Sequence, residues 1–325
     1  MKSLDFGRFV LGGFAAAAML AGCGASQPPI GVPGTMPESQ RSAIATQAGR
    51  GGSWMLPEAK SKNLLYAPGG CGGTCVLSAA GGNVVGSLNQ YGDAACSDSA
   101  GDVFLVQDDD VLEYAHGGSS PIATFTLPGD LGSACSVDPS SGALAVVFEG
   151  SDANVAVFPY NGDTPTLYGS HIVSLFCGYD ANGDLFVDGY LGQNYALAML
   201  PKGTSTFAVL SVDYSMGQPG QLQWDGTYMT YEARFEPVRV SRFTVSGSTV
   251  NIVGVTKIAD LHKRAVPSWI RSGKIFIPYP NHGTETKQLG EWNYPKGGKQ
   301  IKRFNFGSYQ SGLNLQAITY SAATN

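Results

Sequence analysis

Three cysteines recur at one position of a repeated pattern, in which an acidic turn, a glycine and an apolar run follow each thiol. The segments are CSDSAGDVFLV from Cys96, CSVDPSSGALAVV from Cys135 and CGYDANGDLFVDG from Cys177. Three thiols that converge on one region would suit a zinc ion. No Cys-x-x-Cys pair and no nearby histidine has zinc-site spacing, so we expect these side chains to behave as small buried hydrophobic groups.

Cys71 and Cys75 belong to a different pattern, the glycine-rich segment CGGTC. A disulfide closes such a short loop if the chain doubles back, and it removes little chain entropy from the unfolded state. We predict this bond. The pairing of the other cysteines stays open, because the five that follow Cys23 leave at least one without a partner.

Two acidic segments are candidates for a divalent cation, the only cofactor that the sequence suggests. Carboxylate and amide oxygens are the ligands that Ca²⁺ prefers. In DANGDLFVD the glycine occupies the fourth position, whereas an EF-hand loop requires it at the sixth. The same Asp-x-x-Gly-Asp spacing occurs earlier in the chain, which favours a structural turn. The candidate ligands are Asp108, Asp109, Asp110, Asp180, Asn182 and Asp184.

Side chains for acid–base or nucleophilic catalysis are few, and no catalytic residue can be assigned. The histidines are His116, His171, His262 and His282. We expect His116 to be a solvent-facing turn residue, and His262 and His282 to lie on loops. No Ser-His-Asp set and no Gly-x-Ser-x-Gly elbow can be assembled from the spacing. Two tryptophans near innermost strands, Trp224 and Trp269, either line a central channel or pack in the core.

The repeat that carries these residues has a period of about 40 residues. Its anchors, each just before an apolar strand, lie 38, 41, 41, 43 and 47 residues apart, at Asn63, Gly101, Gly142, Gly183, Gly226 and Gly273. Each unit contains four short strands separated by tight turns, and glycine is abundant, with 44 residues. This pattern predicts an all-β fold, a six-bladed β-propeller of four-stranded antiparallel blades. Residues 317–325 and residues 53–63 compete for the strand that closes the ring.

The N-terminus predicts export. Lys2 and Arg8 form a short basic region before an apolar run, Phe9 to Leu20; together they resemble a signal peptide, which ends in LAGC, Leu20 to Cys23. This segment resembles the lipobox of bacterial lipoproteins, which implies that Cys23 is lipidated and anchors the chain to the outer membrane or cell surface. We therefore expect a signal peptide at 1–22, a lipidated, flexible tether at 23–53 and the propeller at 54–325.

The period and the hairpins, especially VLEYAHGGSSPIATF, resemble those of NHL-type six-bladed propeller lipoproteins of bacteria. The resemblance covers residues 54–325 and implies a binding or interaction scaffold of unknown ligand. The alternative is a metal-dependent hydrolase or lyase, similar to lactonases, with its site at the channel mouth. Those enzymes use acidic, Asn or His residues that cannot be matched here, so we favour a non-enzymatic role.

Charge is distributed unevenly along the chain. Residues 63–201 contain fifteen acidic residues and no Lys or Arg, whereas residues 257–303 contain ten basic residues and three acidic ones. The basic unit predicts a patch for an anionic partner, unless its charge serves solubility alone. Export argues against nucleic acid, which leaves the lipid bilayer at Cys23 and a protein or glycan as partners. The patch comprises Lys296, Lys299, Lys302 and Arg303.

Overall fold

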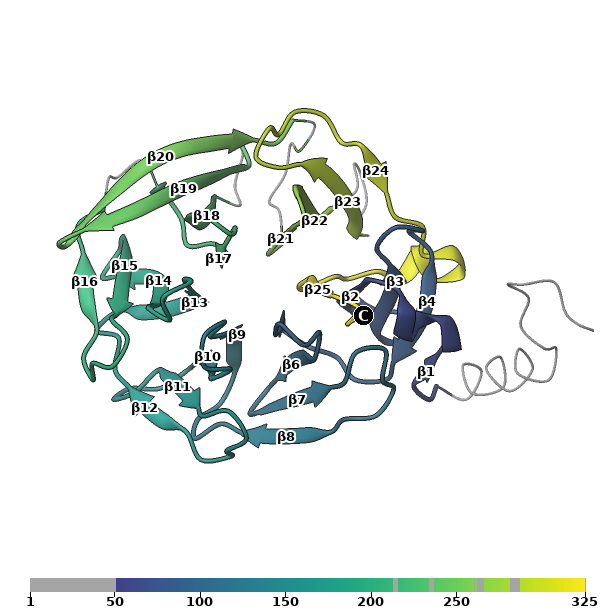
Figure 1. Ribbon diagram of the computed structural model, residues 1–325, viewed down its shortest axis with the longest axis horizontal. Helices are drawn as coiled ribbons and strands as arrows, with labels where there is room; N and C mark the ends of the chain where they lie inside the picture. Colours follow the sequence, from purple (N-terminus) through teal and green to yellow (C-terminus); the bar gives the residue numbers. More distant parts are fainter. Residues whose placement is uncertain are drawn as a thin grey trace, which may run out of the picture. The chain divides into compact units, whose positions relative to one another are not determined.

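The computed structural model describes residues 51–212, 216–233, 237–259, 261, 266–280 and 287–324. The chain divides into two units, Met1–Arg41 and Ser42–Asn325, and all described residues belong to the second. These residues form six antiparallel sheets arranged in a ring, which confirms the predicted six-bladed propeller (Figure 1). Cys23, the tether and the signal segment lie outside the described residues. No described helix is long and apolar enough to cross a membrane.

The blades follow the chain in order, and the first also contains the last strand. Blade 1 contains β1 (Trp54–Met55), β2 (Leu64–Gly70), β3 (Gly73–Ser78), β4 (Val84–Leu88) and β25 (Thr319–Ser321). Blade 2 contains β5 (Ala94–Ser97), β6 (Val103–Gln107), β7 (Asp110–Tyr114) and β8 (Ala123–Thr126). Blade 3 contains β9 (Gly132–Val137), β10 (Leu144–Phe148), β11 (Val155–Phe158) and β12 (Thr166–Tyr168).

The other three blades repeat this order from the innermost strand outward. Blade 4 contains β13 (Val173–Tyr179), β14 (Leu185–Leu191), β15 (Asn194–Leu200) and β16 (Ala208–Leu210). Blade 5 contains β17 (Leu222–Trp224), β18 (Met229–Ala233), β19 (Arg239–Ser246) and β20 (Thr249–Lys257). Blade 6 contains β21 (Trp269–Arg271), β22 (Lys274–Pro280), β23 (Lys287–Asn293) and β24 (Lys302–Arg303). Two 3-10 segments, η1 (Pro57–Ser61) and η3 (Gly307–Gly312), precede β2 and β25.

Both chain ends of the propeller join blade 1, which answers the question of ring closure. β25 pairs antiparallel with β2 and is the innermost strand, while β1 pairs with β4 at the outer edge. The C-terminus therefore lies beside β2 (Figure 1). The closing strand also contacts blade 2, where the Ser97 hydroxyl donates to the Tyr320 carbonyl over 2.7 Å. A first and a last strand in one sheet leave no open end in the ring.

The repeated acidic turn has a backbone cause. Gly101, Gly142, Gly183 and Gly226 all have positive φ, between 76° and 102°, where a side chain would be strained. The aspartate at the start of each turn accepts backbone N–H groups of the same turn; Asp180 Oδ1, for example, accepts from Asn182 at 2.8 Å and Asp184 at 2.9 Å. These Asx turns connect the innermost strand to the second strand of the blade.

The hydrophobic core lies between adjacent blades. One cluster joins Ala134 and Val147 of blade 3 to Cys177 and Val187 of blade 4, and all four are buried. Strands that are covered on both faces explain why the second strand of each repeat is a nearly continuous apolar run. The short, strictly ordered strands leave the turns at both ends of the channel free to form sites.

Candidate binding site at the mouth of the channel

A cavity of about 660 Å³ opens at the end of the channel where the Asx turns lie. We name it the turn-side cavity. Residues from all six blades line it, because the six innermost strands end there. The side chains on which the argument depends are Tyr179, Gln223, Trp224, Trp269, Arg271 and Tyr320.

Trp269 is one of the residues that line this cavity. It begins β21 of blade 6, and Ile270, the next residue, points to the other face and is 6% exposed. The half-buried indole packs against one cluster in blades 1 and 6 and against a second in blades 2 and 3 that contains Cys96 and Cys135. An aromatic side chain from blade 6 that touches blades 2 and 3 reaches across the channel.

The rim between blades 5 and 6 is fixed by side-chain hydrogen bonds. The Gln223 amide donates to the Ile270 carbonyl at 2.8 Å and accepts from the Ile270 N–H at 2.7 Å. The Tyr294 hydroxyl donates to Asp225 Oδ2 at 2.6 Å. Burial, followed by this contact with Asp225, raises the pKa of Tyr294, so the phenol stays protonated and remains a donor. The two blades therefore present Trp224 and Trp269 from a common, rigid frame.

Several donors of the cavity have no protein acceptor. Within the described part of the chain, neither the indole N–H of Trp224 nor that of Trp269 makes a hydrogen bond, and the exposed guanidinium of Arg271 makes neither a hydrogen bond nor an ion pair. The Tyr179 hydroxyl is likewise without a described partner. Burial raises the pKa of Tyr179, so its hydroxyl remains an O–H donor at neutral pH. The carboxylates of the turns, by contrast, already accept backbone N–H groups.

Cys96 and Cys135 form a disulfide beside the cavity, which corrects the expectation that both act as small hydrophobic groups. Their Cα atoms are 5.7 Å apart on the innermost strands of neighbouring blades. The shared position of the two cysteines on adjacent innermost strands is the sequence signal that could have suggested the pair. Cys177 is free and buried, and burial raises the pKa of its thiol.

The Cys71–Cys75 disulfide is present as predicted, with Cα atoms 5.1 Å apart. It closes the turn between β2 and β3. The Ser87 hydroxyl of β4 donates to the Cys71 carbonyl at 3.0 Å, which attaches this loop to the rest of blade 1. The bond thus stabilises the blade that contains both ends of the propeller.

The cation candidates occupy turns. Asp108 and Asp109 form the two-residue hairpin between β6 and β7, and Asp110 Oδ1 accepts from the Thr126 hydroxyl at 2.9 Å. In the other segment, Asp180 accepts the amides of its own turn, as described above. Among the described residues, no three His, Cys, Asp or Glu side chains are grouped as a metal site requires. The lactonase-like alternative therefore has no metal-ligand set in this part of the chain, and cation binding at these turns stays a prediction.

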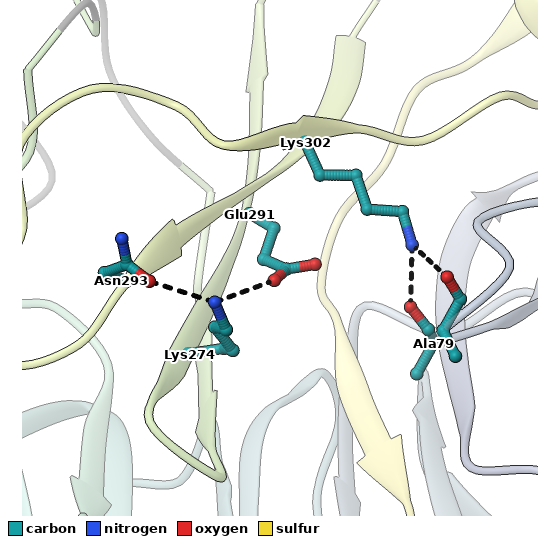
Figure 2. Close-up of polar contacts among 6 residues, drawn as sticks. Ala79, Lys274, Glu291, Asn293 and Lys302 are labelled. Atoms are coloured by element: carbon teal, nitrogen blue, oxygen red, sulfur yellow. Dashed lines mark hydrogen bonds and ion pairs between the residues drawn. The ribbon is translucent and has the colours of Figure 1, made fainter.

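The basic patch divides into a structural and an exposed part. Lys302 Nζ donates to the carbonyls of Ala79 at 2.9 Å and Ala80 at 2.7 Å, so it joins blade 6 to blade 1 (Figure 2). Burial lowers the pKa of Lys302. Lys274, drawn beside it, donates to Asn293 and lies 3.6 Å from Glu291. The other members of the predicted patch, Lys296, Lys299 and Arg303, are exposed.

His116 is not a solvent-facing residue, contrary to the expectation. Its Nδ1 lies 2.5 Å from the Ser321 hydroxyl of the closing strand, and its Nε2 is buried without a hydrogen bond. His171 is exposed and lines a second cavity, of about 1,100 Å³, at the opposite mouth of the channel. That cavity is lined by Asp93, Asp108, Glu149 and Asp152 and, among the described residues, by no Lys or Arg. His262 and His282 lie outside the described residues.

Two buried acids were missed from the sequence. Asp188 and Glu232 occupy the same position of β14 and β18 and are 0% and 1% exposed. Asp188 accepts from the Gly220 N–H and Glu232 from the Ser268 N–H, both at 2.9 Å. Each carboxylate therefore holds the segment that leads into the next innermost strand. The signal was an acid at the end of an apolar second strand, DLFVD and TYMTYE.

Comparisons with known proteins support the propeller fold and indicate no function. No family model and no curated protein matches this chain. Among solved structures, it is similar to a Bacteroides caccae protein of unknown function, with a TM-score of 0.59 and 10% identity over 80% of this chain and 99% of that one. It is also similar to U3-55K, with a TM-score of 0.51 and 10% identity over 81% and 83% of the two chains. At such identities the likeness shows the propeller fold alone.

Proposed function

We propose that this protein is a lipid-anchored binding protein of the bacterial cell envelope, with its ligand site in the turn-side cavity. The observation that carries the proposal is the convergence of six innermost strands on one cavity that contains two half-buried tryptophans and several unpartnered donors. Concave sites with aromatic walls and a few placed polar groups are typical of small-molecule binding. The propeller supplies a rigid frame, so little entropy is lost when a ligand binds.

The anchor rests on the lipobox-like LAGC segment and on the tether that follows it. A single lipidated cysteine, followed by about 30 residues of a composition typical of flexible linkers, would hold the propeller near the bilayer, with an r.m.s. reach of roughly 30 Å if the segment behaves as such a linker. The test is the Cys23→Ala variant of the full chain in its native type of host. We expect it to lose the acyl mass and to leave the membrane fraction. A variant that stays acylated and membrane-bound contradicts the anchor.

The binding site is tested with two matched insertions, one at each mouth of the channel. Ser99→Trp places an indole in the turn-side cavity, and Leu191→Trp places one in the opposite cavity; both positions are exposed. The wild-type domain is titrated calorimetrically with oligosaccharides, aromatic carboxylates, quaternary ammonium compounds and short peptides. We expect at least one class to bind once per chain and to lose binding in Ser99→Trp only. Loss in Leu191→Trp alone, or no binding by any class, contradicts the proposal.

A further inference from the structure

The aromatic groups of the turn-side cavity provide flat apolar surface in a polar setting. Trp269 lines the cavity from blade 6, Trp224 lies on the neighbouring innermost strand, and Tyr179 and Tyr320 add rings from blades 4 and 1. Flat aromatic faces bind flat apolar ones, such as the C–H face of a pyranose or a second aromatic ring. These rings alone do not choose between the two.

The hydrogen-bonding groups of the cavity make the choice. Among the described residues, the unpartnered donors are two indole N–H groups, the Tyr179 hydroxyl and the Arg271 guanidinium, and they lie beside acceptor oxygens of Asp98 and Gln221. The site therefore requires a ligand with acceptor oxygens on several sides, because donors that lose water without gaining an acceptor oppose binding. A ring with many hydroxyl and ether oxygens provides them, whereas a plain aromatic ligand does not.

The charged groups at the cavity are of both signs. Asp98, Asp138 and Asp225 contribute negative charge, while Arg271 and the Lys202 ammonium, which donates to Ser140 at 2.6 Å, contribute positive charge. Charges of both signs therefore lie at the cavity, so charge alone selects neither a cationic nor an anionic ligand. The volume of about 660 Å³ lies within the range of roughly 300–1,000 Å³ for small-molecule sites.

We propose that the turn-side cavity binds a saccharide, with a sugar ring stacked on Trp224 or Trp269 and its oxygens accepting from the indole, Tyr179 and Arg271 donors. This inference rests on the proposed binding function and names its ligand class. Arg271 lies at the exposed edge of the cavity and binds either a sugar hydroxyl or the carboxylate of a uronic acid. The shared chemistry is the hydroxylated ring, and the two sources are separated by experiment.

The test uses isothermal titration of the domain from residue 50 with maltotriose, chitotriose and trigalacturonate, and with benzoate and choline as non-sugar probes. We expect at least one trisaccharide to bind and to bind at least ten-fold more weakly to Trp224→Ala, with partial rescue by Trp224→Phe. Leu191→Trp should bind normally. Arg271→Gln should weaken trigalacturonate several-fold more than the neutral sugars if a carboxylate is recognised, and all sugars equally if a hydroxyl is.

The outcomes separate this inference from the proposed function. Binding of benzoate or choline that Ser99→Trp abolishes, with no binding of any sugar, overturns the saccharide and leaves the site. Sugar binding that survives both Trp224→Ala and Ser99→Trp overturns the site as well. Variant folding is verified by far-ultraviolet circular dichroism and melting temperature, because Trp224 packs partly against the core of blades 4 and 5.

Discussion

The disulfide between blades 2 and 3 should be the stronger of the two covalent links, and its contribution can be worked out from loop length. Cys96 and Cys135 are 39 residues apart, and Cys71 and Cys75 are 4 apart. In the chain-entropy model the longer loop contributes about 3.9 kcal/mol to the free energy of unfolding and the shorter about 1.9 kcal/mol. At about 2–4 °C per kcal/mol for a domain of this size, removal of the longer link lowers Tm by about 8–16 °C.

The assay compares two double variants, Cys96→Ala/Cys135→Ala and Cys71→Ala/Cys75→Ala, with the wild type in thermal and urea unfolding followed by tryptophan fluorescence. We expect the first to lose about twice as much stability as the second. A thiol titration of the denatured, unreduced domain should find one thiol per chain, that of Cys177, since four of the five cysteines are paired. An equal loss of stability in both variants refutes the entropic reasoning. Three or more thiols per chain mean that at least one of the two disulfides is absent.

Three further predictions concern polar side chains that hold neighbouring blades together. Burial lowers the pKa of His116 below its unfolded value of 6.5. This residue therefore contributes stability that is present above pH 6.5 and is lost as the pH falls through the lower folded pKa. His116→Gln should flatten this part of the stability–pH curve, measured by urea unfolding. Lys302→Met leaves two carbonyls without their charged donor and should cost about 1–2 kcal/mol in urea unfolding, whereas the exposed control Lys299→Met should change stability by less than about 0.5 kcal/mol. Asp188→Ala removes the acceptor of the Gly220 N–H and should cost about 2–3 kcal/mol, while Asp188→Asn, which keeps a carbonyl oxygen, should cost less; an equal loss in both variants would mean that charge, not the acceptor, matters.

The propeller could be predicted because each repeat contains the same kind of turn, and that turn restricts which residues its backbone accepts. A glycine with positive φ and an aspartate that accepts backbone N–H groups recur because the turn itself requires them, so the pattern can be recognised from residues that are close in the sequence. The Cys71–Cys75 bond was predictable for the same reason, since its loop is short. The sequence could not decide which strand closes the ring, because β25 and β2 are brought together only when six blades complete the circle.

The site was harder to predict because its residues are close only in the folded ring. Trp269 belongs to blade 6 and packs against a cluster of blades 2 and 3 that contains Cys96 and Cys135, a contact that no spacing along the chain indicates. The same geometry hides the Cys96–Cys135 bond, since the two thiols are local in none of the repeats. Repetition predicts which residues share a position, and the radius of the ring decides which of them touch.

The polar contacts that hold neighbouring blades together, which we call the joints of the ring, share one property that bears on where function can evolve. Each is a buried or partly buried polar contact between blades: Lys302 on the carbonyls of blade 1, Asp188 and Glu232 on the segments that enter blades 5 and 6, and His116 on the closing strand. A buried polar contact costs free energy when either partner is removed, so these positions tolerate little change. The unpartnered donors of the turn-side cavity contribute nothing comparable to the ring. Substitution there alters the surface offered to a ligand at little cost in stability, and a fold held by its joints can carry different ligands at one mouth.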